Sequence, residues 1–179
     1  MRLLFIIYLV LSLILIFLLV LPSVVSARVT PNDYYQQSRA NFESQLSKIS
    51  DVGKRDKVKQ ADQLLYDINQ KVCSRFDEDL NKLSVILEEL KRRNGVTETV
   101  VAFGQGDTQL DTAAYWLNYA AEAVAYQKIQ DYTPSLNLSS LSGSFTIQIN
   151  SLKGDLGVLK NKILRAKSEV KKAVDQYDK

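Results

Sequence analysis

A stripe of apolar residues at helical spacing, between residues 58 and 90, constrains this chain more than any other feature. Its members recur at steps of three and four, the period at which side chains share one face of an α-helix. Asn94-Gly95 then provides a helix C-terminus. A helix this long with one apolar face must pack along other long helices. The stripe consists of Val58, Ala61, Leu65, Ile68, Val72, Phe76, Leu80, Leu83, Leu87 and Leu90.

Two more helices are predicted on either side of this one. Thr30-Pro31-Asn32-Asp33 combines proline with capping residues and predicts a helix start, and Gly53 predicts a break before the long stripe. After a linker at residues 96–106, Asp107 or Thr108 is expected to cap the next helix. Its expected core positions are Leu110, Ala113, Leu117, Ala120 or Ala121, and Val124, and the earlier helix carries Tyr35, Phe42, Leu46 and Ile49.

The segment after Pro134 supports two interpretations. Residues 145–150 alternate between apolar and polar side chains as a β-strand does, whereas the apolar positions from Leu138 onward keep helical phase as far as Tyr177. Phase continuity over so many residues outweighs a short alternation, so we expect a helix across residues 138–177. The fold class predicted is all-α: an elongated antiparallel three- or four-helix bundle with long helices like those of coiled coils.

The N-terminal sequence predicts that the chain enters or crosses a membrane. Residues 3–21 are apolar apart from Ser12, and Arg2 precedes them. Pro22 and the small residues up to Ala27 suit a signal peptide cleaved after Ala27, while the length of the apolar run suits a retained membrane anchor. In both cases residues 28–179 are expected to form one extracytoplasmic domain, either secreted or anchored with the N-terminus in the cytoplasm.

Charge and composition exclude several classes of function. Arg2 is the only charged residue before Ala27. Without it the chain has 22 basic and 20 acidic residues, and a net charge this small gives no reason to expect nucleic-acid binding. Residues 96–150 hold one Lys and five acids, whereas residues 153–179 hold eight basic residues and four acids, and the two stretches should attract each other. The chain has no histidine and one cysteine, Cys73, which excludes a structural zinc site and predicts a free, buried thiol.

Short motifs carry little chemistry. Asp77, Asp79, Asn81 and Glu88 match oxygen positions of a calcium loop, but Lys82 stands where the sharp turn requires glycine, so a solvated helix face is expected. Residues 103–107 contain two glycines without the rest of a phosphate-binding motif and predict a loop. Residues 137–139 form a glycosylation sequon. We expect no cofactor, no metal and no enzyme activity.

One surface departs from an ordinary helical exterior. Tyr115, Tyr119, Glu122 and Tyr126 fall on the face of their helix opposite the Leu110–Leu117–Val124 stripe. Tyrosines suit half-wet protein interfaces, so Tyr115, Tyr119 and Tyr126 are the candidate partner-binding residues. The alternative is that this face packs on another helix of the same chain.

The sequence therefore favours a non-enzymatic helical protein of the cell envelope with a structural or partner-binding role. Its partner is expected to be another protein or a second copy of the chain, with the membrane as a further contact through residues 3–21 if they are retained. A second hypothesis is peripheral membrane binding through the basic C-terminal helix or the uncharged segment 132–152. A third is a hydrolase without a recognisable motif.

Overall fold

The computed structural model describes residues 31–96 and 108–177. Their regular structure is entirely helical: α2 spans Pro31–Ser47, α3 Val52–Arg93, α4 Gln109–Lys128 and α5 Leu141–Tyr177. The predicted all-α bundle is confirmed. Residues 35–179 form one compact unit, and its boundary falls inside α2. The predicted membrane segment 3–21 lies outside the described residues, and within them no helix is both long and apolar enough to cross a bilayer.

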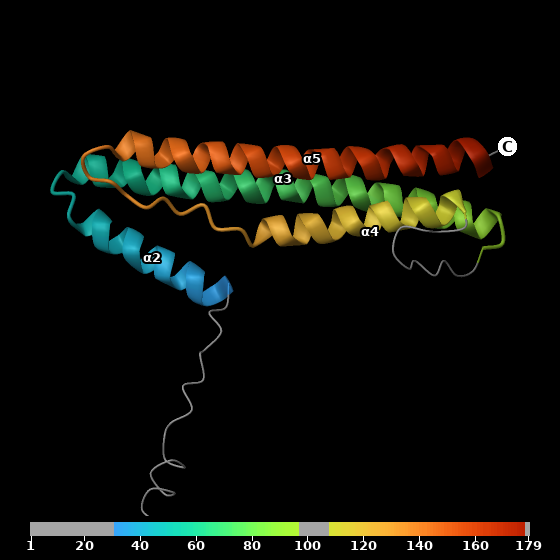
Figure 1. Ribbon diagram of the computed structural model, residues 1–179, viewed down its shortest axis with the longest axis horizontal. Coiled ribbons are helices and arrows are strands. Elements are labelled where there is room, and N and C mark those ends of the chain that lie inside the picture. Colours follow the sequence, from blue (N-terminus) through green and yellow to red (C-terminus); the bar gives the residue numbers. More distant parts are fainter. Residues whose placement is uncertain (1–30, 97–107, 178–179) are drawn as a thin grey trace, which may run out of the picture. The chain divides into compact units, whose positions relative to one another are not determined.

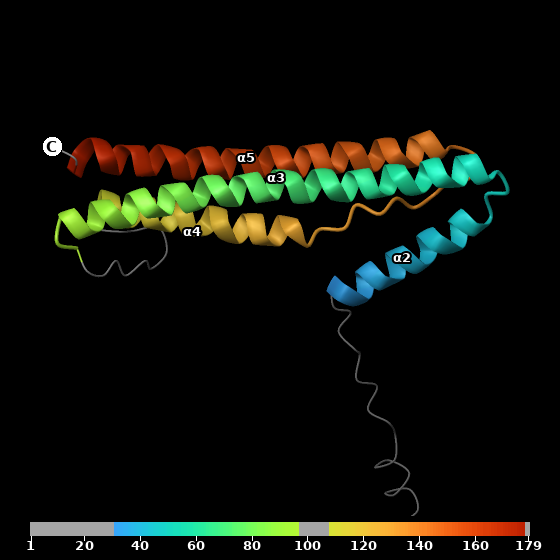
Figure 2. The same ribbon diagram turned by 180° about the vertical axis from the view of Figure 1, so that it is seen from behind.

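Helices α3, α4 and α5 lie side by side (Figures 1 and 2). The end of α4 meets the middle of α3, where Asn69 Nδ2 donates to the carbonyl of Gln127 at 2.9 Å. The start of α4 meets the C-terminal part of α5, where Gln109 Nε2 donates to Glu169. Helix α4 therefore runs antiparallel to both long helices, and α3 and α5 run parallel to each other.

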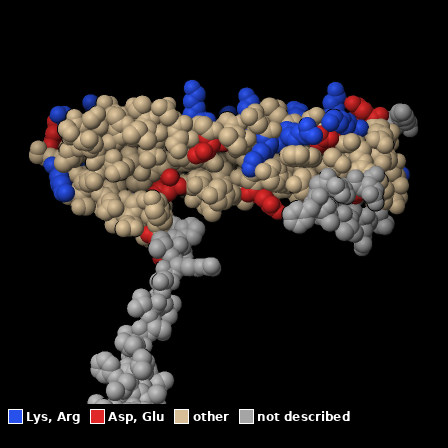
Figure 3. All heavy atoms as spheres, in the orientation of Figure 1, with Lys and Arg blue, Asp and Glu red and all other residues tan. Residues whose placement is uncertain are grey.

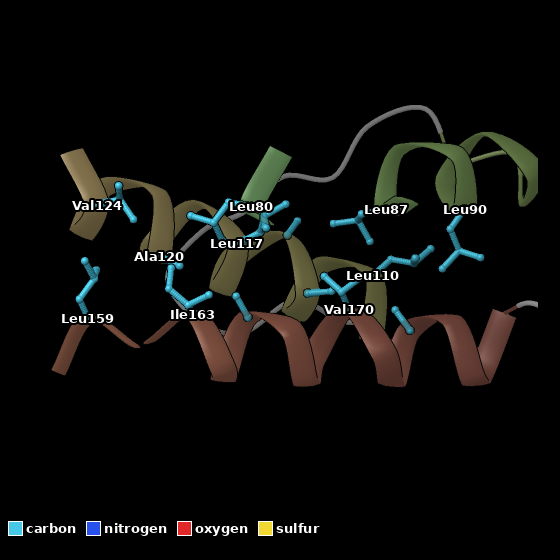
Figure 4. Close-up of a cluster of buried hydrophobic side chains, with 14 of the residues drawn as sticks. Leu80, Leu87, Leu90, Leu110, Leu117, Ala120, Val124, Leu159, Ile163 and Val170 are labelled. Carbon is cyan, nitrogen blue, oxygen red and sulfur yellow. The ribbon is translucent and has the colours of Figure 1, made fainter. Parts of the chain in front are cut away.

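The part of the bundle that contains α4 holds the main core, and we call residues 73–96, 108–128 and 156–177 the α4-covered half. Figure 4 shows leucine, valine and isoleucine side chains from α3, α4 and α5 converging there. Between them lie Ala113, Ala120, Ala166 and Ala173, all fully buried, and such small side chains let the helix axes approach closely. The predicted stripe of α4 is confirmed, with Ala120 buried and Ala121 exposed.

The other part of the bundle, which we call the α2-side half, comprises residues 35–70 and 129–155. Its core consists of two smaller clusters. One joins α2 to the start of α3 through Phe42, Leu46, Ile49, Val58 and Leu136. The other joins α3 to α5 through Leu65, Tyr132 and Leu152. On the α4 side of this half the extended segment 130–137 continues from α4, and α2 packs against it through Leu136 (Figure 1).

Three helix boundaries differ from or sharpen the sequence predictions. The break predicted at Gly53 lies earlier, because Asp51 accepts a hydrogen bond from the Lys54 amide and caps α3 before Gly53. Thr108 caps α4 by accepting from the Asp111 amide, as one of the two expected caps. Residues 141–151 are helical as predicted, but residues 138–140 are not, because α5 begins only at Leu141.

The predicted stripe of α3 is wrong in its middle. Ile68 is 40% exposed and Val72 is only half-buried, while Asn69 and Cys73 are completely buried. The physical reason is the C-terminus of α4, whose last carbonyls have no partner within their own helix. Asn69 donates to the Gln127 carbonyl and Gln70 donates to the Lys128 carbonyl, so α3 turns a polar residue toward α4 and an isoleucine toward solvent.

Candidate functional site

The three candidate tyrosines lie on α4 with different degrees of exposure. Tyr115 is half-buried, Tyr119 is 38% exposed and Tyr126 is 66% exposed. The rings of Tyr115 and Tyr119 are stacked, with centroids 6.2 Å apart. Their one-turn spacing on a helix places them face to face. The face is only partly covered by its own chain, so packing within the chain accounts for Tyr115 better than for Tyr126.

Part of the covering comes from α5, as in the alternative that this face packs on another helix of the same chain, although the residues that provide it were not predicted. Trp116 meets Tyr115 and Tyr119 edge to face, at centroid distances of 5.5 and 5.6 Å. Arg165 lies over Trp116 at 5.1 Å, and Lys162 lies over Tyr119 at 4.6 Å. Each such cation–π contact stabilises by about 0.5–1 kcal/mol at a partly exposed site. Arg165 and Lys162 thus fix the aromatic rings and place two cationic groups beside them.

Beside Tyr119 lies a hollow of about 450 Å³ between α4 and α5, which we call the tyrosine hollow. Its polar groups include two carboxylates, Glu122 and Asp155, and the ammonium group of Lys162. The complete lining is Tyr119, Glu122, Ala123, Tyr126, Gln127, Gln130, Asp155, Val158, Leu159 and Lys162. Tyrosine rings are enriched at protein interfaces, because ring and hydroxyl together suit a half-wet surface.

A buried hydrogen-bond chain lies behind the tyrosine hollow. Gln127 Nε2 donates to Asn69 Oδ1 at 3.0 Å and lies 2.6 Å from the Tyr132 hydroxyl. The Tyr132 hydroxyl donates to Asp155 Oδ2 at 2.8 Å. Burial, together with the Asp155 carboxylate, raises the pKa of Tyr132 well above its usual value, so the phenol stays protonated and keeps donating. The chain holds Asp155 and Gln127, two lining residues, in fixed positions.

A buried carboxylate, Glu169, joins the start of α4 to α5. It accepts from Arg165 Nε at 2.9 Å, Lys172 Nζ at 3.0 Å and Gln109 Nε2 at 3.1 Å. Burial by itself would raise the pKa of Glu169, but the donors Lys172 and Gln109 and the charge of Arg165 outweigh it and lower the pKa. Glu169 also holds Arg165 where it lies over Trp116, so this carboxylate positions one edge of the aromatic surface.

A second hollow, of about 440 Å³, lies between α3 and α5 in the α2-side half, and we call it the α3–α5 groove. Its walls include Leu64, 57% exposed, and Ile149, 50% exposed. The lining is almost wholly apolar: Ala61, Leu64, Leu65, Ile68, Phe145, Ile149, Leu152, Lys153 and Leu156. The sequence did not reveal this groove, because the stripe analysis assigned Ile68 to the core.

The remaining sequence candidates fall into three places. Asp77, Asp79 and Asn81 lie in the unbroken helix α3. Asp79 and Asn81 are exposed as expected for a solvated face, whereas Asp77 is half-buried and pairs with Lys128 of α4. Cys73 is free and fully buried, with its thiol 3.7 Å from Asn69 Oδ1. Asn137 of the sequon is exposed and its side chain accepts from Ser139. The two-glycine segment 103–107 lies outside the described residues.

Comparison of the chain with known protein families, with curated proteins and with solved structures finds no match in any of the three.

Proposed function

We propose that this chain is a non-enzymatic helical protein of the cell envelope that binds another protein through the tyrosine hollow. The support for the envelope is the sequence of residues 3–21, with Arg2 before them. The support for a protein partner is the composition of the hollow, in which two tyrosines stand beside charges of both signs. Ring and hydroxyl together suit a surface that is wet in the free protein and dry in the complex.

The observation that carries the proposal is the exposure of Tyr126. Its ring is 66% exposed although it borders a hollow whose back wall is held rigid by the Gln127–Tyr132–Asp155 chain. A large amphipathic side chain at the open rim of a preformed hollow contributes little to the stability of the free chain. It contributes most when a partner covers it, as aromatic residues do in binding hot spots.

The experiment is site-specific photo-cross-linking of the full chain in the cells that produce it. A photoreactive phenylalanine analogue replaces Tyr126 in one variant and Tyr66 in a control variant; Tyr66 lies on α3 and is 49% exposed. We expect one discrete adduct from position 126 and none from position 66. A second variant, Tyr119→Ala combined with the label at 126, should weaken that adduct because Tyr119 forms the adjacent wall.

Equal adducts from positions 126 and 66, or none from either, would contradict the proposal. Mass spectrometry of the N-terminus in the same preparation shows whether the chain begins at Arg28, after cleavage, or retains residues 3–21 as an anchor. A chain found in the cytoplasm with an intact N-terminus would contradict the envelope assignment.

A further inference from the structure

The α3–α5 groove leaves apolar side chains in water on one face of the bundle. Leu64, Ile68 and Ile149 are 57%, 40% and 50% exposed, and all three line the groove. On α3 this face points away from the α4 side at Leu64, which lies five residues before Asn69 and is therefore turned about 140° from it, while Asn69 donates to α4. Contiguous exposed apolar residues on a folded domain mark a surface that meets something else.

The same face carries a row of exposed cations. On α5, Lys153, Lys160 and Lys167 follow Ile149 at helical spacing and stand seven residues apart, so they share its face. On α3, Lys71 and Arg75 follow Ile68 in the same way. No carboxylate of a described residue forms an ion pair with any of these five side chains. Figure 3 shows Lys and Arg side chains projecting along the α5 edge of the bundle.

The charge pattern decides between possible occupants. A second copy would place one lysine row against another, which like charges oppose. An anionic surface satisfies both features at once, since its charge meets the lysines while its apolar layer receives the leucine and isoleucines. Glu78 and Asp79 follow Arg75 on α3, so the attraction is concentrated over α5 and the groove. A row of cations along one long helix also matches a flat partner rather than a short peptide.

We propose that the groove face, formed by Leu64, Ile68, Ile149, Lys153, Lys160 and Lys167, docks on a bilayer that contains anionic lipids. The three apolar side chains enter the boundary between headgroups and acyl chains, and the lysines contact phosphate groups. This surface is separate from the tyrosine hollow, so either proposal can fail without the other.

The test uses residues 28–179, which retain the whole described core, since every core cluster lies within residues 35–179. This domain should co-sediment with vesicles of phosphatidylglycerol and phosphatidylcholine, but not with vesicles of phosphatidylcholine alone. The double variant Lys153→Glu/Lys160→Glu should lower the vesicle affinity by at least about 25-fold, about fivefold for each lysine. Leu64→Ser and Ile149→Ser should each lower it about tenfold.

Two matched controls separate the face from net charge and from general apolarity. Lys48→Glu/Lys59→Glu changes the net charge equally at exposed positions outside the face, and Ile147→Ser removes an apolar side chain that is 68% exposed on the side of α5 opposite Ile149. Both should bind vesicles as the unchanged domain does. Thermal melting should show every variant folded, because all the changed side chains are exposed.

Three results would overturn the proposal. The first is no binding to anionic vesicles. The second is an equal loss of binding in Lys48→Glu/Lys59→Glu, which would leave only net charge as the cause. The third is sedimentation of the domain as a dimer that Leu64→Ser dissociates, or co-purification of an acidic protein that Lys153→Glu/Lys160→Glu abolishes without any vesicle binding. The third result would mean that a second copy or another protein covers the groove.

Discussion

In the α4-covered half, α3 and α5 share one continuous core with a third helix, whereas in the α2-side half the core is divided among α2, the extended segment 130–137 and the two long helices. The first half buries leucines and alanines from three helices in one continuous cluster. The second half divides its core between two small clusters and leaves Leu64 and Ile149 exposed. The two long parallel helices are covered by α4 over one part of their length, and by α2 and the extended segment 130–137 over the other.

Buried charged groups are also more completely paired in the α4-covered half than in the α2-side half. Glu169, in the α4-covered half, accepts from three donors. The Arg39–Asp62 ion pair, in the α2-side half, leaves Arg39 Nε and Asp62 Oδ1 without partners among the described residues. Burial raises the pKa of Asp62, although Arg39 opposes the shift. The α4-covered half, with its fully paired buried carboxylate, is therefore the scaffold, and the α2-side half is the part whose buried polar groups are incompletely paired.

The largest expected effect comes from a leucine pair on α3. Leu87 is 1% exposed within the main cluster, and Leu64 is 57% exposed at the groove. Leu87→Ala should lower the free energy of unfolding by about 2–5 kcal/mol, since it leaves a cavity. Leu64→Ala should lower it by less than about 1 kcal/mol. Urea unfolding of both variants measures the contrast, and similar losses would contradict the difference between the halves.

A smaller effect is expected where the two halves meet. Asn69→Ala removes the donor to the Gln127 carbonyl and leaves the buried Gln127 side chain without one partner. The free energy of unfolding should fall by about 1–3 kcal/mol, the range for stranding a buried polar group. Asn81→Ala, at an exposed position of the same helix, is the matched control and should change it by less than about 0.5 kcal/mol. A neutral Asn69→Ala would show that α4 does not depend on α3 for its C-terminal cap.

The smallest effect concerns pH. Because the pKa of Glu169 lies below its ordinary value of 4.5 in the folded chain, its contribution is present above that value and is lost as the pH falls through the folded pKa. Glu169→Gln should lower the free energy of unfolding at pH 7 by about 0.5–1 kcal/mol, a modest loss because Arg165 and Lys172 are half exposed. At a pH below the folded pKa the variant and the unchanged chain should be equally stable. A constant difference at all pH values would contradict the ion-pair account.

The sequence allowed much of this fold to be predicted, because most helices are specified locally. Thr108 and the Leu110–Val124 stripe of α4 depend only on neighbouring residues, as does the seam of α5 from Leu159 to Ala173. The burial of Asn69 in place of Ile68 could not be predicted, since it depends on the α4 C-terminus, 58 residues further along the chain. A periodicity analysis also favours the isoleucine, whose burial is the usual outcome.

The candidate sites divide in the same way. Tyr115 and Tyr119 stack because they are one turn apart on α4, and this proximity follows from spacing alone. Lys162 and Arg165 come from α5, so their contacts with Tyr119 and Trp116 depend on how two helices pack. The α3–α5 groove was not predicted because Ile68 and Ile149 keep the helical phase of the two predicted stripes, and which stripe positions stay open depends on how α3 and α5 pack.

The measurement that tests the difference between the halves most directly is native-state hydrogen exchange along α3, because this one helix passes through both. We expect amides of residues 73–93 to exchange only on global unfolding, and amides of residues 53–68 to exchange faster through local opening of the α2-side half. Mass spectrometry of peptides from the exchanged domain, residues 28–179, resolves the two segments. Equal protection along α3, or slower exchange in residues 53–68, would contradict the assignment of the α4-covered half as the scaffold.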